Sequence, residues 1–434
     1  MKVKYYLKRC IFCRKPAGTA AVFFERRERM KRWFYAVIGV IILLLAGMVY
    51  AWSVMAKTIS AARPEWSATA LSLTFTLVMA LFCIGCLLAG ILAKRIKARI
   101  YILLAGVLFL AGFFLASLTG ASILPLYLGF GILCGIASGF CYNAVMSTMS
   151  AWFPDKQGLI SGILLMGFGL SAFLVGKLFA AAAPPTGDDA WKMTFRMMGI
   201  IIFVILMVCS IFVTAPPENY APASDGNQKK KEGRAPALDI GTGEMMKKVS
   251  FWLYYIWAVL LSVAGLALVS QASGIAAQVG STVSAGTIAT VVGLISILNG
   301  IGRVIFGTMY DKGGYRPTMA VVMIGFLVTG LILLTAIRTG SFGLIILGFV
   351  CGGFSYGGVT PTNSALISDF YGRTHYSMNF SVINTNLLIA SFGSTIAGRL
   401  YDRSGSYVST ILMMIFVTVA GFAVYLGIRR PKKA

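Results

Sequence analysis

The sequence predicts an all-α membrane protein whose twelve transmembrane helices form two six-helix bundles. Three observations predict this fold. The composition is much more apolar than that of a soluble domain, twelve long apolar stretches follow one another, and short sequences recur at an offset near half the chain length.

Of the 434 residues, 58% are hydrophobic and 12% are charged, and the mean hydropathy is +0.82. His375 is the single histidine, and the 14 acidic residues fall almost entirely in the polar breaks between apolar stretches. Few residues are therefore available to form an active site for general acid/base or metal-dependent catalysis. We therefore expect no enzyme and no cofactor. The pair Cys10 and Cys13 has no second ligand pair, so no metal is expected either.

The apolar stretches are long enough to cross ~30 Å of hydrocarbon at about 1.5 Å per helical residue. We predict spans at 33–55, 67–93, 100–118, 122–150, 157–183, 193–215, 250–276, 283–309, 317–337, 341–368, 376–398 and 406–428.

The distribution of positive charge predicts the orientation of these spans. Of the 38 Lys and Arg residues, 29 fall on the side that carries both termini, 8 fall on the other side, and Arg303 lies within a span. Positive charge near span ends is retained in the cytoplasm. We therefore expect a multi-pass protein of the bacterial cytoplasmic membrane with both termini inside. The net charge of +24 then reflects topology and contact with anionic lipid, and nucleic acid is not an expected partner.

A polar, Lys-rich stretch at the middle of the chain separates two halves. The predicted organisation is a basic N-terminal extension (1–29), a first bundle (30–215), a cytoplasmic linker (216–249), a second bundle (250–428) and a basic tail (429–434). The extension lacks the apolar core of a signal peptide, and we expect it to be dispensable, flexible or the product of an upstream start.

An internal repeat supports this division. Gly139–Tyr142 recurs as Gly353–Tyr356, and Gly90 with Lys94 after span two corresponds to Gly307 with Asp311 after span eight. Halves repeated in the same orientation place a substrate site between them, near the middle of the membrane.

Three motifs carry a resemblance to a known family. They are Tyr50-Ala51-Trp52-Ser53 in span one, Trp152–Leu159 between spans four and five, and Asn299-Gly300-Ile301-Gly302-Arg303 with Gly307 and Asp311 in and after span eight. Together they resemble the oxalate/formate antiporter family of the major facilitator superfamily, from about Met30 to the end of span twelve. The resemblance implies the major facilitator fold and exchange, or proton-coupled movement, of small organic acids. Lys94 departs from the usual aspartate of the first half. The corresponding position of the second half has the usual aspartate, Asp311. Asp311 and Asp155 are the predicted gating residues.

Arg303 is the principal candidate site residue. An arginine within a span costs roughly 2.5–3.5 kcal/mol to insert, so it is expected to face a polar environment. Asn299 and Gly307 lie on the same helical face. None of the predicted spans contains Asp or Glu, and a guanidinium pairs well with a carboxylate. We therefore expect the missing partner to be a substrate carboxylate. The alternatives are that Arg303 snorkels to the cytoplasmic end or pairs with Asp311 as a gate.

Tyrosines supply hydrogen-bond donors without charge, and Tyr50, Tyr142 and Tyr356 lie within spans one, four and ten. Tyr142 and Tyr356 are equivalent positions of the repeat. By resemblance, the positions of Tyr50, Trp52 and Tyr142 line the central cavity of the family. The alternative for each tyrosine is packing or an interfacial position.

Span eleven bears on the charge of the substrate. By resemblance, oxalate-carrying members have a lysine there, whereas this span has no Lys or Arg and places Asn384 and Asn386 near that position. One guanidinium balances one negative charge, and an uncompensated charge in a low-dielectric cavity is costly. We expect an alternating-access transporter of a monocarboxylate such as formate, lactate or pyruvate, working as a monomer. A proton or counter-anion is the expected coupling partner.

Three alternatives remain. The asparagines serve packing while Lys57 or Lys177 supplies a second cation; the protein exchanges dicarboxylates of the oxalate/formate type; or it is a sensor that uses the same fold without transport.

Overall fold

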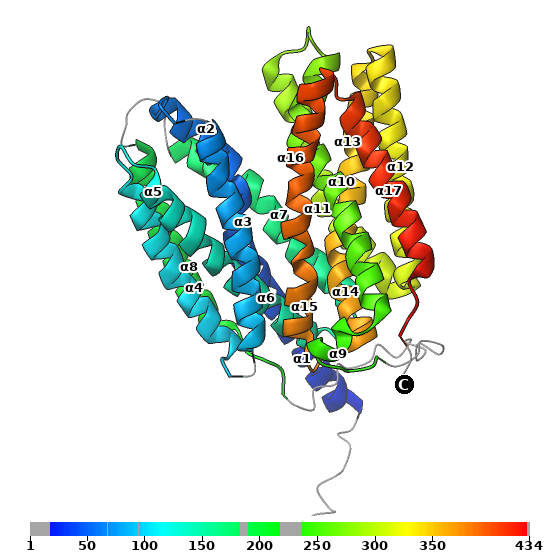
Figure 1. Ribbon diagram of the computed structural model, residues 1–434. Helices are drawn as coiled ribbons and strands as arrows, with labels where there is room; N and C mark the ends of the chain where they lie inside the picture. Colours follow the sequence, from blue (N-terminus) through cyan, green and yellow to red (C-terminus); the bar gives the residue numbers. More distant parts are fainter. Residues whose placement is uncertain (1–17, 67, 94, 183–189, 218–236, 432–434) are drawn as a thin grey trace, which may run out of the picture.

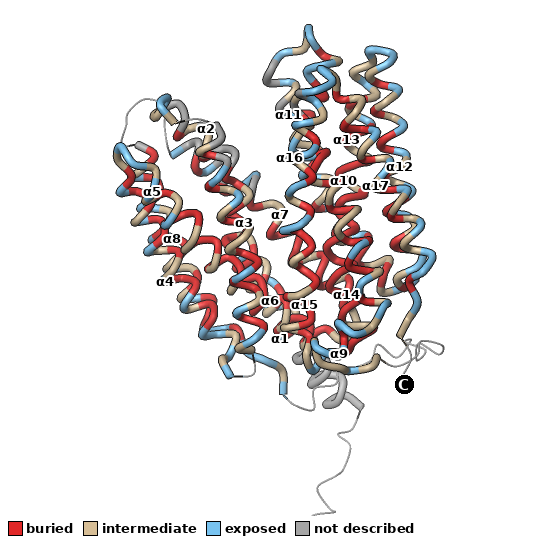
Figure 2. The backbone as a smooth tube through the Cα atoms, in the orientation of Figure 1, coloured by how far each residue is buried: buried red, intermediate tan, exposed pale blue. Residues whose placement is uncertain are grey.

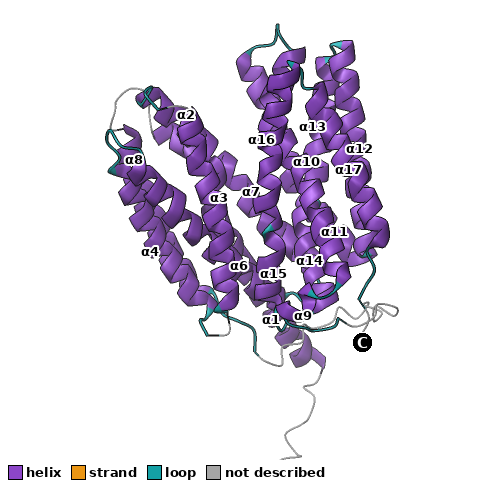
Figure 3. Cartoon of the chain, viewed as in Figure 1, coloured by secondary structure: helices purple, strands orange, loops and turns teal. Residues whose placement is uncertain are grey.

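The computed structural model describes residues 18–66, 68–93, 95–182, 190–217 and 237–431. All regular structure in these ranges is helical (Figure 3). Twelve helical segments in the described ranges are long and apolar enough to cross a membrane. The predicted all-α class and the number of spans are therefore confirmed.

The first six spans come from ten elements, some of which share a span. They are α1 (Gly18–Ala46), the 3-10 turn η1 (Gly47–Ala51) and α2 (Trp52–Ala62); α3 (Ala68–Ile91); α4 (Ala98–Ser117); α5 (Leu124–Leu126), the π-helix η2 (Tyr127–Cys134) and α6 (Gly135–Trp152); α7 (Gln157–Ala182); and α8 (Ala190–Phe212).

The second six spans follow a short helix of the linker, α9 (Thr242–Met246). They are α10 (Val249–Val279); α11 (Ala285–Gly313); α12 (Tyr315–Thr339); α13 (Phe342–Tyr356) with α14 (Val359–Tyr371); α15 (Tyr376–Asn384) with α16 (Asn386–Ser404); and α17 (Val408–Gly427). In the predicted N-terminal extension, residues 18–29 belong to α1, and residues 1–17 lie outside the described ranges.

Three spans that the sequence predicts as continuous are interrupted near their middle. Span one tightens into the 3-10 turn η1, span ten breaks between Tyr356 and Val359, and span eleven breaks at Thr385. Gly357 and Gly358 weaken the helix at the second break. At the third, the Thr385 hydroxyl donates to the Val382 carbonyl at 2.8 Å and so competes with the helical ladder. Interrupted helices at mid-membrane are typical of transporter substrate sites.

The two bundles lie together at one end and diverge toward the other (Figure 1). We call the closed end, where α9 and the C-terminal residues lie, the linker end. There α15 packs on α3 and α6, and α7 packs on α11 and α14 of the opposite bundle. Buried residues are concentrated between the bundles toward this end (Figure 2).

The described part of the linker is docked on the second bundle. We call residues 237–248 the linker strap. The Leu238 and Ile240 amides donate to the Phe370 and Tyr371 carbonyls at 3.0 and 3.1 Å. The Asp239 carboxylate accepts hydrogen bonds from the loop that precedes α15, including one of 2.6 Å from the Thr374 hydroxyl. The strap therefore braces the start of α15.

Neutralising Asp239 is expected to loosen the strap. Partial burial alone would raise the pKa of Asp239, but hydrogen bonds from the Thr374 hydroxyl, the Thr374 amide and the Arg373 amide lower it. A lowered pKa means that the carboxylate stabilises the docked strap above about pH 4 and loses this effect as the pH falls below that value. We expect Asp239→Asn to increase amide hydrogen exchange in residues 370–379 at neutral pH. The exposed Glu244→Gln is the control, and equal exchange in both variants would contradict the assignment.

Candidate functional site

Arg303 lies on α11 at the contact between the bundles, with 7% of its surface exposed. Its Nε donates to Asn299 Oδ1 one turn earlier, at 3.0 Å. Its Nη1 donates to the backbone carbonyl of Leu165 on α7. The bond to Leu165 therefore joins the two bundles, and both partner oxygens are neutral. Within the described ranges it forms no ion pair.

Glycines on α7 create the space that the guanidinium occupies. A Cβ at Gly169 would lie 3.0 Å from Nη1 and 3.4 Å from Cζ of Arg303, and a Cβ at Gly162 would overlap the Arg303 backbone carbonyl. The backbones of α7 and α11 are therefore close enough for Arg303 to reach Leu165. Two of its five N–H donors have these partners, and the other three, on Nη1 and Nη2, have none among the described residues.

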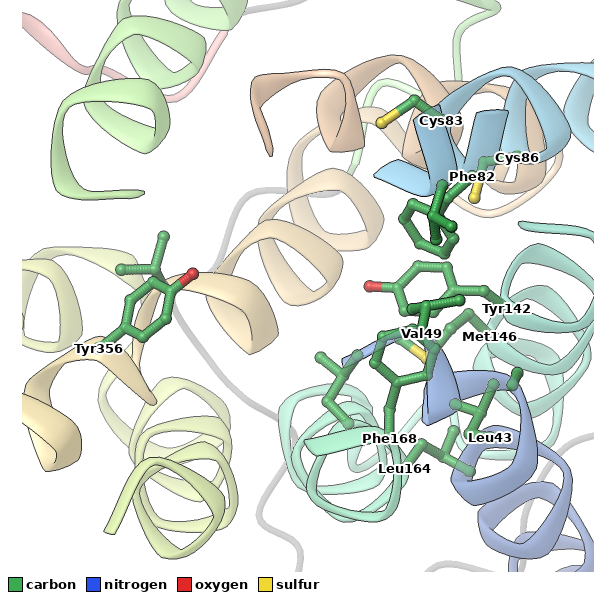
Figure 4. Close-up of a cluster of buried hydrophobic side chains, with 14 of the residues drawn as sticks. Leu43, Val49, Phe82, Cys83, Cys86, Tyr142, Met146, Leu164, Phe168 and Tyr356 are labelled. Carbon is green, nitrogen blue, oxygen red and sulfur yellow. The ribbon is translucent and has the colours of Figure 1, made fainter. Parts of the chain in front are cut away.

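Three tyrosine hydroxyls lie within electrostatic range of this cation. Tyr50 lies in η1, Tyr142 in α6 and Tyr356 at the end of α13, and the charge of Arg303 acts electrostatically on each hydroxyl. The hydroxyls of Tyr142 and Tyr356 point toward one another from opposite bundles (Figure 4). Gly265 of α10 makes room for Tyr356, since a Cβ there would overlap its ring. None of the three hydroxyls has a hydrogen-bond partner among the described residues. Of the five predicted residues, Arg303 and Asn299 are hydrogen-bonded to each other, and the three tyrosines lie within electrostatic range of Arg303.

Asn384 and Asn386 flank the break in span eleven, with 1% and 0% of their surfaces exposed. The Asn384 side-chain nitrogen and both side-chain amide atoms of Asn386 have no partner among the described residues. The Tyr255 hydroxyl meets the Thr385 hydroxyl at 2.8 Å in the same region. Buried amides without partners are costly, so these two side chains are candidates for binding water or a ligand. In the described ranges no hydrogen bond joins them to Arg303.

Trp52 faces the interior of its own bundle. Its indole N–H donates to the Leu71 carbonyl at 3.2 Å, and its ring packs on Phe130 with centroids 4.9 Å apart. The predicted alternative cations, Lys57 and Lys177, have side chains that fall outside the description.

The two predicted gating residues have different positions. Asp311 accepts hydrogen bonds from the Gly158 and Leu159 amides at the start of α7, at 2.9 and 2.8 Å, and so joins the bundles at the linker end. Asp155 pairs with Arg32 of its own bundle at 2.9 Å. Arg303 and Asp311 thus have different partners, which argues against the alternative that they pair with each other.

A polar contact that the sequence did not indicate also closes the linker end. Asn143 of α6 donates to the Ser377 carbonyl of α15 at 3.0 Å and bonds the Ser381 hydroxyl, and that hydroxyl lies 2.6 Å from the Cys86 carbonyl of α3. The only signal in the sequence was the uncharged polar residues within spans four and eleven. Such residues are also common at simple helix contacts.

Two helix bundles that meet at a buried cation within the membrane have the architecture of a secondary transporter. Residues 38–387 match the family model of the Major Facilitator Superfamily, and the chain belongs to this superfamily. The predicted fold and family resemblance are therefore confirmed.

Three similar proteins illustrate the relationship. The oxalate:formate antiporter of Oxalobacter formigenes is 25% identical over 400 residues, which cover 91% of each chain. Human monocarboxylate transporter 12 is 23% identical over 367 residues, 77% of this chain and 69% of the relative. The E. coli fucose:proton symporter FucP has a similar fold, with a TM-score of 0.62, 15% identity and coverage of 92% of this chain and 98% of that one.

Proposed function

We propose that this transporter moves a small monocarboxylate, of the formate, lactate or pyruvate type, across the membrane by alternating access. The observation that carries the proposal is the buried guanidinium of Arg303, which has no acidic partner in the described ranges and keeps three donors available. Three tyrosine hydroxyls extend this donor set. A small carboxylate is the ligand that such a set of donors fits.

The charge count favours one carboxylate over two. In the described spans, Asp311 and Asp369 lie at the linker end of their helices and have partners there. Span eleven offers the neutral amides of Asn384 and Asn386 at its break. A dianion bound to Arg303 would keep about one uncompensated charge in a dry site, at a cost of several kcal/mol. Dicarboxylate exchange is the alternative, and the similarity to an oxalate:formate antiporter supports it.

The orientation proposal follows from the positive charges around the linker end. We place this end in the cytoplasm of a bacterial cell, with the protein in the cytoplasmic membrane. The described conformation is then closed to the cytoplasm, and Asp311 is one of the contacts that must open for release inside. Asp155 supports the same region from within the first bundle. The protein is proposed to work as a monomer, with a proton or counter-anion as the coupled species.

Exchange in proteoliposomes tests transport against the sensor alternative. Vesicles loaded with unlabelled lactate should take up labelled lactate in a saturable manner, and empty vesicles should take up less. A purified protein that binds lactate but moves none in loaded or empty vesicles would favour a sensor. A protein that neither binds nor transports any of the three acids would refute the proposal.

Gly169→Ala is expected to weaken substrate binding without preventing folding. The new Cβ would lie 3.0 Å from Arg303 Nη1, so the guanidinium must shift by a few tenths of an ångström, which disturbs its bond to Leu165. We expect a rise of about tenfold in the apparent KM for lactate, equivalent to one misplaced charge-assisted hydrogen bond. Gly293→Ala is the matched control on α11, because no atom lies within 4 Å of a Cβ at Gly293. The same KM in both variants would contradict the placement of Arg303 in the site.

A further inference from the structure

A row of five aromatic rings leads from the candidate site to the linker end. Tyr50 packs edge-to-face on Phe168 with centroids 5.5 Å apart, and Phe168 packs on Tyr142 at 5.2 Å. Tyr142 lies parallel to Phe380, at 5.7 Å and 9°, and Phe380 lies parallel to Tyr376, at 5.1 Å and 11°. The first three rings belong to the first bundle. The last two project from α15 of the second bundle.

Tyr376, at the far end of this aromatic row, is connected to the first bundle by hydrogen bonds. The Tyr376 hydroxyl meets the Ser364 hydroxyl at 2.7 Å, and Ser364 bonds Ser161 of α7. Beside the row, Asn143 bonds Ser377 and Ser381 of α15. Phe380 therefore sits inside the contact that closes the linker end.

Tyr142 takes part in both the site and this contact. Its hydroxyl points toward Tyr356 (Figure 4) and lies within electrostatic range of Arg303. Its ring is held by Phe82 and Phe168 of its own bundle and by Phe380 of the other. A phenol ring needs neighbours on its faces and edges to keep its hydroxyl in one direction. One of the three neighbours comes from the opposite bundle.

We infer that Phe380 is a positioning residue for transport: it holds the Tyr142 hydroxyl in the site only while the linker end is closed. The inference rests on the proposed function. When α15 leaves α6 as the linker end opens, Phe380 leaves with it and the Tyr142 ring loses that support. The carboxylate is then bound more weakly in the state that is open at the linker end. The site thereby favours release toward that side.

A double-mutant cycle on lactate binding tests this inference. Tyr142→Phe keeps the stacked ring and removes the hydroxyl, while Phe380→Leu keeps an apolar side chain and removes the stacked ring. We expect each single change to raise the Kd of purified protein for labelled lactate about tenfold. The double variant should bind no more weakly than Tyr142→Phe, because the hydroxyl is already ineffective without Phe380. Losses that multiply to about a hundredfold would overturn the inference.

Tyr376→Phe separates positioning from a looser linker end. It keeps the stack and removes the hydrogen bond to Ser364, so it should leave the Kd within about twofold. If it weakens binding as much as Phe380→Leu does, Phe380 acts only by closing the linker end, and the positioning role is refuted.

A measurement without ligand makes the two proposals distinguishable. In protein labelled with fluorotyrosine, the fluorine resonance of Tyr142 is identified by its loss in Tyr142→Phe. Phe380→Leu should shift or broaden this resonance in the absence of any acid, and Tyr376→Phe should not. If the Tyr142 resonance is unchanged in Phe380→Leu, the positioning role is refuted. If Phe380→Leu changes the resonance but the wild-type protein binds no carboxylate, only the proposed function is refuted.

Discussion

Arg303→Gln is expected to abolish carboxylate transport while leaving insertion and folding intact. The glutamine side chain can still bond a neutral oxygen such as the Leu165 carbonyl, but it carries no charge to pair with a carboxylate. Removing one partner of a desolvated pair costs roughly 3–5 kcal/mol, which corresponds to a loss of more than a hundredfold in affinity. Initial rates of labelled lactate exchange in proteoliposomes measure the effect, and the elution volume on size exclusion reports folding.

Arg303→Lys is the matched control, because it keeps the positive charge and loses the planar guanidinium. A lysine cannot reproduce the bond of Nε to Asn299 together with the bond of Nη1 to Leu165, so it should recover little of the exchange. If the Gln variant has near-normal affinity for lactate, Arg303 does not belong to the site. If the Lys variant restores full exchange, only the charge matters, and the planar pairing with a carboxylate is wrong.

Asn386→Lys is expected to change the preferred charge of the substrate. Asn386 is fully buried at the break of span eleven, and neither of its side-chain amide atoms has a partner among the described residues. A lysine there would add a second cation at the break of span eleven. At an effective dielectric constant near 20, a second charge pair is worth on the order of a few kcal/mol. We expect the ratio of oxalate to lactate uptake to rise at least about tenfold.

Asn386→Met is the neutral control for that experiment, because its side chain is similarly long but carries no charge. It should lower all uptake alike and leave the ratio unchanged. An equal shift in the Met and Lys variants would show that the shape of the site sets the preference. No shift in either would place Asn386 outside the site.

The fold was largely predictable because its main signals are long and repeated. Twelve apolar stretches are unambiguous by length, and the midpoint linker with the repeat of Gly139–Tyr142 indicated two bundles. In the site, the helical spacing of Asn299 and Arg303 predicted that they share a face, and the structure has a hydrogen bond at that spacing. Tyr142 and Tyr356 occupy equivalent positions in the repeat, and their hydroxyls point toward one another from opposite bundles.

The remaining features depend on contacts that no single segment encodes. The partner of Arg303 on α7 is a backbone carbonyl, which side-chain patterns do not reveal, and it is within reach because Gly162 and Gly169 let two backbones approach. The break at Thr385 and the docking of Asp239 are tertiary effects that override local propensity. Trp52 was predicted by resemblance, and its hydrogen bond to Leu71 within its own bundle could not be read from its position in the sequence.

Competition for uptake by the wild-type protein tests the central claim most directly. Proteoliposomes take up labelled lactate in the presence of excess unlabelled formate, pyruvate or oxalate, at a pH where oxalate is a dianion. Because Arg303 balances a single negative charge, formate and pyruvate should compete strongly and oxalate weakly. Saturable oxalate uptake that outcompetes lactate, formate and pyruvate would contradict the account.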